Sequence, residues 1–253
     1  LLNGHGWGVA TFNSIESLAN SFSDARDSSN AIIPDEQIRI TDGEPYDAHI
    51  ENKMDDPFDA HSDDEKVELL TRYNDIMRSH GDEIIVARSG YTDVHTDKLF
   101  VNSLGITTRH SRRDGWISGI ARAKRGNDIQ QSMVSLNTMQ RFSELTDMDE
   151  KMNKAAQNAI DLLDAKSVNG GKYTVVLNQK LAGVFIHEAF GHLSESDFIL
   201  ENPQAQKMMT LGRRFGQSFL NVFDDGTIEP ALRGTIHYDD EGTPAKKTYL
   251  IQN

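Results

Sequence analysis

The sequence predicts an α+β fold: an antiparallel β-meander with packed helices, and a metal motif on a helix that follows a strand. Three observations support this. From residue 83 to 141, apolar and polar residues alternate with period two in short runs separated by turn residues. On both sides of this region, apolar residues recur at helical spacing. At 173–177, the run YTVVL is typical of a strand and precedes another helical segment.

The part before the meander predicts a strand at 7–12 (WGVATF) and a helix at 14–29 with Ser14 as its N-cap. The acidic stretch 42–68 is interrupted by proline, so we expect mostly a solvated loop. A calcium site there is disfavoured because the ligand spacing of an EF-hand loop is missing. A second helix is expected at 64–79, with a buried stripe of Val67, Leu70, Tyr73 and Met77.

The meander is expected to have about five strands, with turns at Asp114-Gly115 and Gly126-Asn127. Alternation would place many of its basic residues on one exposed face. That face is either a solvated surface or a docking site for a carboxylate or an acidic partner. The residues are Arg109, Arg112, Arg113, Arg122, Lys124 and Arg125.

After the meander, the pattern predicts a helix, a strand and a second helix capped by Asn178, followed by a further helix and two short strands. The expected ranges are 147–165, 173–177, from 179 onward, 204–215, 219–224 and 235–238. The buried stripe of the second helix would be Leu181, Val184 and Phe185. We divide the chain into an N-terminal α+β region with the meander (1–141) and a helical segment that carries the metal motif and the start of a C-terminal β domain (142–253).

The chain has 253 residues, a net charge of −13 and no cysteine. A general basic surface for nucleic acid is therefore not expected. No apolar run approaches the roughly 18 residues of a membrane span, and the N-terminus lacks the pattern of a signal peptide. We expect a cytoplasmic protein with no nucleic-acid or membrane partner, and a chain trimmed at both ends from a longer protein.

The stretch HEAFGHLSESD (187–197) contains the candidate chemistry. Two histidines and a glutamate are the ligands and base of zinc hydrolases, but the familiar H-E-x-x-H motif sets its histidines four residues apart. His187 and His192 are five apart, which on a regular α-helix separates them by about 140° around the axis. Gly191 weakens the helix just before His192. We therefore expect a one-residue bulge or a helix end there to bring the two rings together.

If the rings converge, His187 and His192 are zinc ligands, and Glu188, which points off the line between them, is the general base. A catalytic zinc needs three protein ligands. Glu195 and Asp197 are the nearest spare carboxylates, and either could be a third ligand or could orient a histidine through its second ring nitrogen. The competing interpretation is that three polar residues share a helix by chance.

The same stretch resembles the metal motif of the TldD/PmbA metalloprotease family, in which H-E-x-x-x-H is followed by a short acidic tail. GHGWGVATFN (4–13) resembles the Gly-Trp-Gly strand of that family, and the DDGT and DDEGTP segments within 222–253 resemble its downstream segments. The three motifs occur in the family's order and span nearly the whole chain. The sequence is identified as a member of the TldD branch.

The resemblance implies a cytoplasmic zinc-dependent peptidase that hydrolyses unfolded or small peptides, with the peptide extended along a sheet edge. It implies a homodimer, or a heterodimer with a metal-free sister subunit. His187 and His192 would bind Zn²⁺ and Glu188 would be the base. The family's third ligand is a cysteine in its C-terminal part, and this chain has no cysteine. The alternative function is a non-catalytic peptide-binding or dimerisation module with an incomplete metal site.

Overall fold

A computed structural model describes residues 1–3, 6–31 and 43–252, so residues 4–5 of the N-terminal motif and residue 42 of the acidic stretch lie outside the described residues. The chain divides into two compact units. The smaller comprises Leu1–Tyr46 and Ser103–Ile106, and the larger comprises Asp47–Asn102 and Thr107–Asn253.

In the smaller unit, β1 (Leu2–Asn3) pairs antiparallel with β2 (Gly6–Trp7), and helix α1 (Leu18–Ala31) follows a short 3₁₀ turn. A Cβ atom on Gly8 would lie 1.8 Å from the carbonyl oxygen of Ala25, so the backbone meets α1 at a distance that only glycine permits. The strand predicted at 7–12 was wrong beyond Trp7, where β2 ends. The helix predicted at 14–29 is confirmed.

The larger unit is built on a four-stranded sheet of β3 (Tyr46–Glu51), β4 (Ile84–Val101), β5 (Ile106–Arg125) and β6 (Asp128–Thr138). β5 is central: it pairs antiparallel with β4 along one side, and β3 and β6 pair with its other side. The α+β class with an antiparallel meander is therefore confirmed.

The prediction of about five strands in the meander was wrong, because three long strands cover that region. Asp114-Gly115 is not a turn but lies inside β5, where Gly115 is paired with Asp93. Glycine is required there for packing, since a Cβ atom would lie 2.6 Å from the ring of Phe58. The turn at Gly126-Asn127 is confirmed, and Gly126 adopts a positive φ of 61° between β5 and β6.

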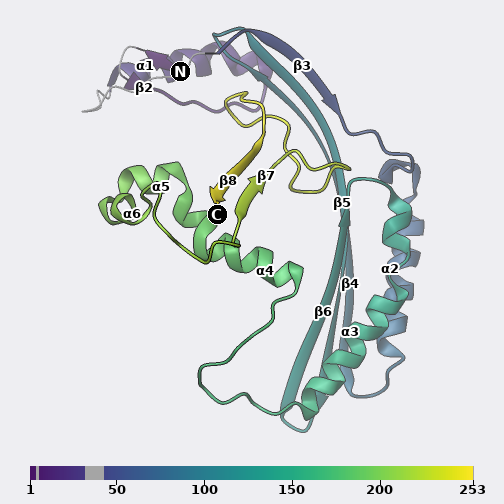
Figure 1. The fold of residues 1–253 in the computed structure, drawn as a ribbon. Helices are drawn as coiled ribbons and strands as arrows, with labels where there is room; N and C mark the ends of the chain where they lie inside the picture. The colour runs from purple at the N-terminus through teal and green to yellow at the C-terminus, as the bar shows by residue number, and fades with distance from the viewer. Residues whose placement is uncertain (4–5, 32–42, 253) are drawn as a thin grey trace. The chain divides into compact units, whose positions relative to one another are not determined.

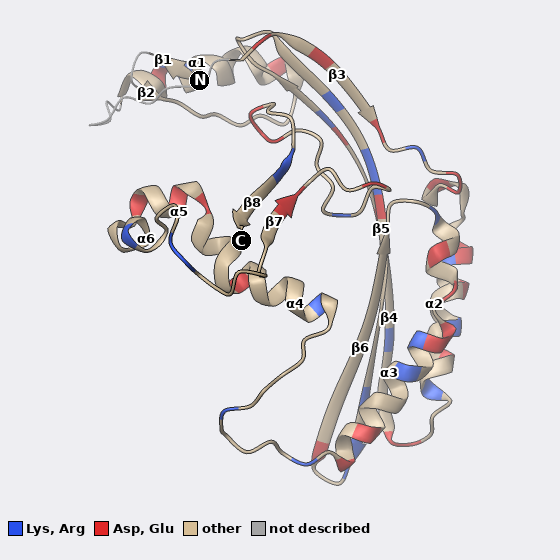
Figure 2. Cartoon of the chain, viewed as in Figure 1, with Lys and Arg blue, Asp and Glu red and all other residues tan. Residues whose placement is uncertain are grey.

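Helices α2 (Asp63–Arg78) and α3 (Asp149–Asp161) cover one face of the sheet (Figure 1). Helix α2 begins with a capping box, in which the Glu65 N–H donates to Ser62 Oγ and the Ser62 N–H donates to the Glu65 carboxylate. Acidic and basic residues are mixed along α2 (Figure 2). The predicted starts of both helices lie within two residues of the observed ones. Both helices pack on the same face of the sheet and share one core.

The core between these helices and the sheet is assembled from α2, α3, β5 and the 3₁₀ turn Phe142–Thr146. Its fully buried members include Tyr73, Met77, Ile117, Ala121, Leu145, Met148, Met152 and Ala156. The predicted stripe of α2 was partly wrong: Leu69 is buried in place of Val67, which is 60% exposed. The Tyr73 hydroxyl joins α2 to the turn region by donating to the Leu145 carbonyl at 2.6 Å and accepting from the Met148 N–H at 3.3 Å.

The C-terminal half contains α4 (Gln179–Ile186), α5 (Ser196–Glu201), α6 (Pro203–Met208), β7 (Val222–Asp225) and β8 (Lys247–Ile251), with β7 antiparallel to β8. Within the described residues, 173–177 forms no strand, so that prediction was wrong. The helix predicted at 204–215 ends at Met208, ahead of Gly212 with a φ of 81°.

The apolar stripe predicted for α4 is exposed rather than buried, since Leu181, Val184 and Phe185 each keep about half of their surface open. Among the helices that the structure describes, none has the length and apolar character needed to cross a membrane.

Tyr73→Phe should lower the free energy of unfolding by about 1–3 kcal/mol, because the Leu145 carbonyl and the Met148 N–H would lose a buried partner. Urea unfolding at pH 7 measures this. Tyr249→Phe, which removes an exposed hydroxyl, is the matched control and should change the free energy by less than ~0.5 kcal/mol. Equal effects of the two changes would contradict a structural role for the Tyr73 hydroxyl.

The stability of the larger unit should fall in acid partly through Asp56. Hydrogen bonds from the His61 ring at 2.6 Å and from the Ser143 N–H at 2.8 Å hold its pKa below 3.8, against an opposing effect of burial. A carboxylate with a lowered folded-state pKa stabilises the fold above its unfolded pKa, and this contribution is lost as the pH falls through the folded value.

Asp56→Asn should therefore lower the free energy of unfolding fully above about pH 5, and the difference from the parent chain should shrink as the pH falls from the unfolded pKa of about 3.9 through the lower folded-state pKa. Asp55→Asn is the control, since the Asp55 side chain is 93% exposed and lies 4.0 Å from Arg141. A deficit for Asp56→Asn that does not change with pH would contradict the ionic origin of the effect.

Candidate metal centre

The candidate site is built on one helical segment that begins at α4. The Asn178 side chain caps this helix by accepting the Leu181 N–H at 2.9 Å, as the sequence predicted. After Ile186 the backbone widens into a π-turn, His187–Gly191, and then tightens into a 3₁₀ turn, His192–Ser194. The π-turn is closed by the His192 N–H, which donates to the His187 carbonyl five residues back. The one-residue bulge expected from the histidine spacing is thus confirmed.

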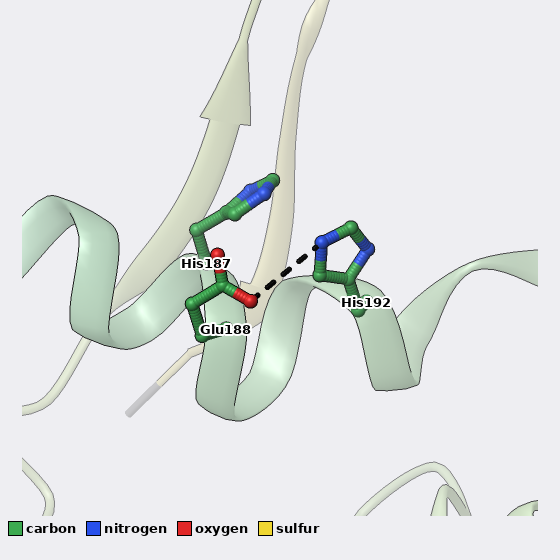
Figure 3. A group of neighbouring side chains, drawn as sticks. All are labelled: His187, Glu188 and His192. Carbon is green, nitrogen blue, oxygen red and sulfur yellow. Dashed lines mark ion pairs between the residues drawn. The ribbon is translucent and has the colours of Figure 1, made fainter.

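The extra residue of the π-turn rotates His192 back over the start of the turn. The imidazole rings of His187 and His192 lie 4.4 Å apart between centroids, at 63° to one another (Figure 3). Potential ligand atoms of His187, Glu188 and His192 all lie within 4.8 Å of one another. The structure therefore brings together the two histidines that a regular helix would separate.

Glu188 lies closer to the histidines than the sequence suggested. Its carboxylate is 3.9 Å from His192 Nε2 and stands beside both rings rather than off their line (Figure 3). The cause is the π-turn, which places His192 above both residues of the His187-Glu188 pair. Glu188 is consequently available either as a third ligand or as a base next to a two-histidine site.

The two acidic residues that follow the motif differ in position. Glu195 Oε1 accepts a hydrogen bond from His192 Nδ1 at 2.8 Å, which directs the other ring nitrogen, Nε2, toward Glu188. Asp197 instead accepts the N–H of Phe198 at the start of α5 and makes no contact with either histidine. Of the two roles considered for these residues, the geometry matches an orienting role for Glu195.

Gly191 does not use the freedom of glycine. Its φ of −53° and ψ of −58° are right-handed helical values, and a Cβ atom would lie 3.6 Å from His187 Nδ1, an ordinary contact. The bulge therefore follows from the hydrogen-bond register of the segment and not from a left-handed residue. A helix end at Gly191 is ruled out, because the chain continues into the 3₁₀ turn.

A groove that the sequence did not predict adjoins the same segment. Phe190 of the π-turn is buried and packs edge-to-face on Phe215, with ring centroids 4.9 Å apart. The groove encloses ≈ 840 Å³ and is lined by Phe190 and Ser194 together with residues 209–218 and 249–252. The sequence signal was Gly212, which breaks the helix expected over 204–215 and creates the lining loop.

Two family domain profiles match this chain: the PmbA/TldA metallopeptidase central domain over residues 56–163 and the PmbA/TldA metallopeptidase C-terminal domain over residues 170–253. The chain is 35% identical over 250 residues to a metalloprotease of Synechocystis, covering 98% of this chain and 53% of that protein. It is 34% identical to a metalloprotease of Methanocaldococcus jannaschii, covering 98% of this chain and 55% of that protein. The chain thus spans about half the length of these curated relatives.

Another relative, a zinc metalloprotease TldD homolog of Saccharolobus solfataricus, is 29% identical over 125 residues, covering 49% of this chain and 28% of that protein. Among solved structures, TldE of Thermococcus kodakarensis matches with a TM-score of 0.64 at 18% identity, covering 97% of this chain and 55% of that one. A Bacteroides thetaiotaomicron protein described as a candidate modulator of DNA gyrase matches with a TM-score of 0.80 at 18% identity. The match covers 98% of this chain and 57% of that one.

An α+β fold with a convergent His-Glu-His group defines the class as metallopeptidase-like. The matching domains and relatives make the assignment specific: the chain belongs to the PmbA/TldD metallopeptidase family.

Gly191→Ala should leave the free energy of unfolding unchanged or raise it by up to ~1 kcal/mol, because the backbone is helical and a Cβ atom has room. Gly183→Ala on α4, where a Cβ atom meets nothing within 4 Å, is the matched control. Urea unfolding compares the two. A marked loss of stability in Gly191→Ala alone would mean that the π-turn does require glycine.

Proposed function

We propose that this chain carries the metal site of a zinc-dependent peptidase that hydrolyses unfolded or small peptides. The observation that supports the proposal most directly is the convergence of His187, Glu188 and His192 across the π-turn, in a chain that belongs to a metallopeptidase family. A regular helix would not place the rings of two histidines five residues apart at a centroid distance of 4.4 Å.

The donor set fits zinc. Zn²⁺ is bound in proteins by neutral imidazole nitrogens and carboxylate oxygens, and these are the donors that His187, His192 and Glu188 offer. The hydrogen bond from His192 Nδ1 to Glu195 is the kind of outer partner that fixes the tautomer of a metal-binding histidine. A bound zinc would supply Lewis acidity, polarising the peptide carbonyl and lowering the pKa of a water molecule toward about 7.

In this proposal each residue of the site has a separate role. His187 and His192 hold the metal, and Glu195 keeps the His192 ring in one orientation. Glu188 accepts the proton of the attacking water and delivers it to the amine that leaves, which suits its position beside both rings and its solvent exposure. The ≈ 840 Å³ groove that shares Phe190 with the π-turn is the candidate binding surface for an extended peptide.

Assembly and location are part of the same proposal. We propose a cytoplasmic enzyme that works as a homodimer or as a heterodimer with a metal-free sister subunit. A partner chain, or a further part of the protein, would then supply the third ligand that leaves Glu188 free to act as the base. The net charge of −13 argues against nucleic acid as a partner.

Glu188→Gln should reduce peptide hydrolysis by about 100- to 10,000-fold while zinc remains bound, because the amide cannot take up a proton. Hydrolysis of a fluorogenic peptide and zinc content by elemental analysis should be measured on the same sample. Glu201→Gln, at the exposed end of α5, is the control and should keep full activity. Loss of zinc together with activity would instead identify Glu188 as a ligand.

The alternative function is a non-catalytic peptide-binding or dimerisation module. It rests on the incomplete metal site, because the chain has no cysteine and the group contains only two histidines. The same experiment separates the two functions. Peptide binding by the parent chain without any zinc-dependent hydrolysis would favour the module, whereas hydrolysis that a chelator abolishes and added zinc restores would favour the peptidase.

Glu195→Gln should weaken zinc binding by about 10- to 100-fold, since the His192 ring would lose the carboxylate that orients it. Asp197→Asn is the matched control, because Asp197 bonds only to the neighbouring Phe198 N–H in its own turn. Competition titration with a zinc chelator of known affinity measures both variants. A larger effect of Asp197→Asn would show that the orienting residue has been assigned to the wrong carboxylate.

A further inference from the structure

A second pair of histidines faces one another outside the candidate metal centre. His110 lies on β5, and His237 lies in the segment 226–246, which connects β7 to β8 and is called the strap here. Their imidazole rings are 5.6 Å apart between centroids and nearly perpendicular, at 75°. Two segments far apart in the sequence therefore place their imidazole rings next to one another.

The strap is held against the sheet by contacts other than those of the histidines. The Arg112 guanidinium donates to the carbonyl of Arg233 at 2.5 Å and to that of Thr235 at 3.4 Å. The Gln140 amide donates to the Ala231 carbonyl at 2.8 Å. The position of His237 opposite His110 is thus fixed before any ligand binds, which lowers the cost of binding one.

His110 and His237 are among the residues that line a pocket of ≈ 180 Å³, as are Glu51 and Glu229. In the part of the chain that the structure describes, neither ring makes a hydrogen bond or an ion pair, whereas His61, His80, His95 and His192 each bond to a side chain. The ring nitrogens of His110 and His237 are therefore open to a ligand in the pocket.

The chemistry of this pocket suits a borderline transition-metal ion. Imidazole is a preferred ligand of Zn²⁺, Cu²⁺ and Ni²⁺, and a carboxylate or water can complete the shell. Two imidazoles bound tetrahedrally to one zinc at about 2.0–2.1 Å have ring centroids roughly 5 Å apart. The candidate metal centre, at 4.4 Å, and this pair, at 5.6 Å, lie on either side of that separation.

Burial and neighbouring cations disfavour the protonated form of His110. Burial, followed by the nearby His237, Arg112 and Lys98, lowers the pKa of His110 below its usual value of 6.5. Metal binding requires an unprotonated imidazole, so His110 can compete for a metal without first losing a proton at neutral pH.

We propose that His110 and His237 form a second metal site, for a divalent transition-metal ion, which pins the strap to β5. The site is independent of the peptidase proposal, since it uses none of the residues of the π-turn. Its ligands are two imidazoles from separate segments, with water completing the shell.

The test uses Ni²⁺ as the probe, in a His192→Ala background that disables the first site. Isothermal titration should detect one Ni²⁺ per chain. His110→Ala and His237→Ala, each added to this background, should weaken binding by at least ~100-fold, because loss of even an outer partner costs about 10- to 100-fold. His95→Ala, which removes a histidine of the same sheet, is the control and should leave the affinity unchanged.

A second measurement guards against loss of folding in the variants. Circular dichroism should match that of the parent chain, and Ni²⁺ should slow tryptic cleavage after Arg233 in the strap only when both histidines are present. The proposal is overturned if the His192→Ala chain binds no Ni²⁺, if His95→Ala weakens binding as much as the other variants, or if Ni²⁺ leaves cleavage of the strap unchanged.

Discussion

One backbone hydrogen bond determines the geometry of the candidate metal centre: the His192 N–H donates to the His187 carbonyl, five residues back. An α-helical bond to the residue four back would have left the two rings about 140° apart around the axis. With the wider turn, ligand atoms of both rings and of the Glu188 carboxylate all lie within 4.8 Å of one another. The convergence of these three side chains depends on this shift of one residue, and π-turns often occur at functional positions.

Periodicity in the sequence was sufficient to locate the long helices. The 3.6-residue pattern placed both ends of α2 within one residue and the start of α3 within two residues, because each helix buries a stripe against the sheet. The alternating pattern located the sheet but not its strand count. Asp114-Gly115 has the composition of a turn, yet its glycine is there to admit the ring of Phe58. Local sequence does not distinguish a glycine that turns the chain from one that makes room for a distant side chain.

The candidate site was predictable to the extent that its residues are consecutive. The histidine spacing was enough to predict a bulge or a helix end, and the structure has the bulge. The separate positions of Glu195 and Asp197 were not predictable, since both follow the motif and only the 3₁₀ turn selects which one reaches His192. The groove beside Phe190 and the His110–His237 pair depend on contacts between remote segments, which no local pattern contains.

The donor count constrains what the π-turn can do. Within the described residues, His187, Glu188 and His192 are the one group of three or more such side chains whose ligand atoms lie close enough to share a metal ion, so three donors are available. If Glu188 is a ligand, the group is a complete three-donor site with no base of its own. If Glu188 is the base, the protein ligands number two, one fewer than a catalytic zinc requires. A single carboxylate cannot bind the metal through its proton-accepting oxygen and also take a proton from water there. The peptidase proposal therefore carries a structural condition: another segment or another chain must bring a third ligand to the open side of His187 and His192.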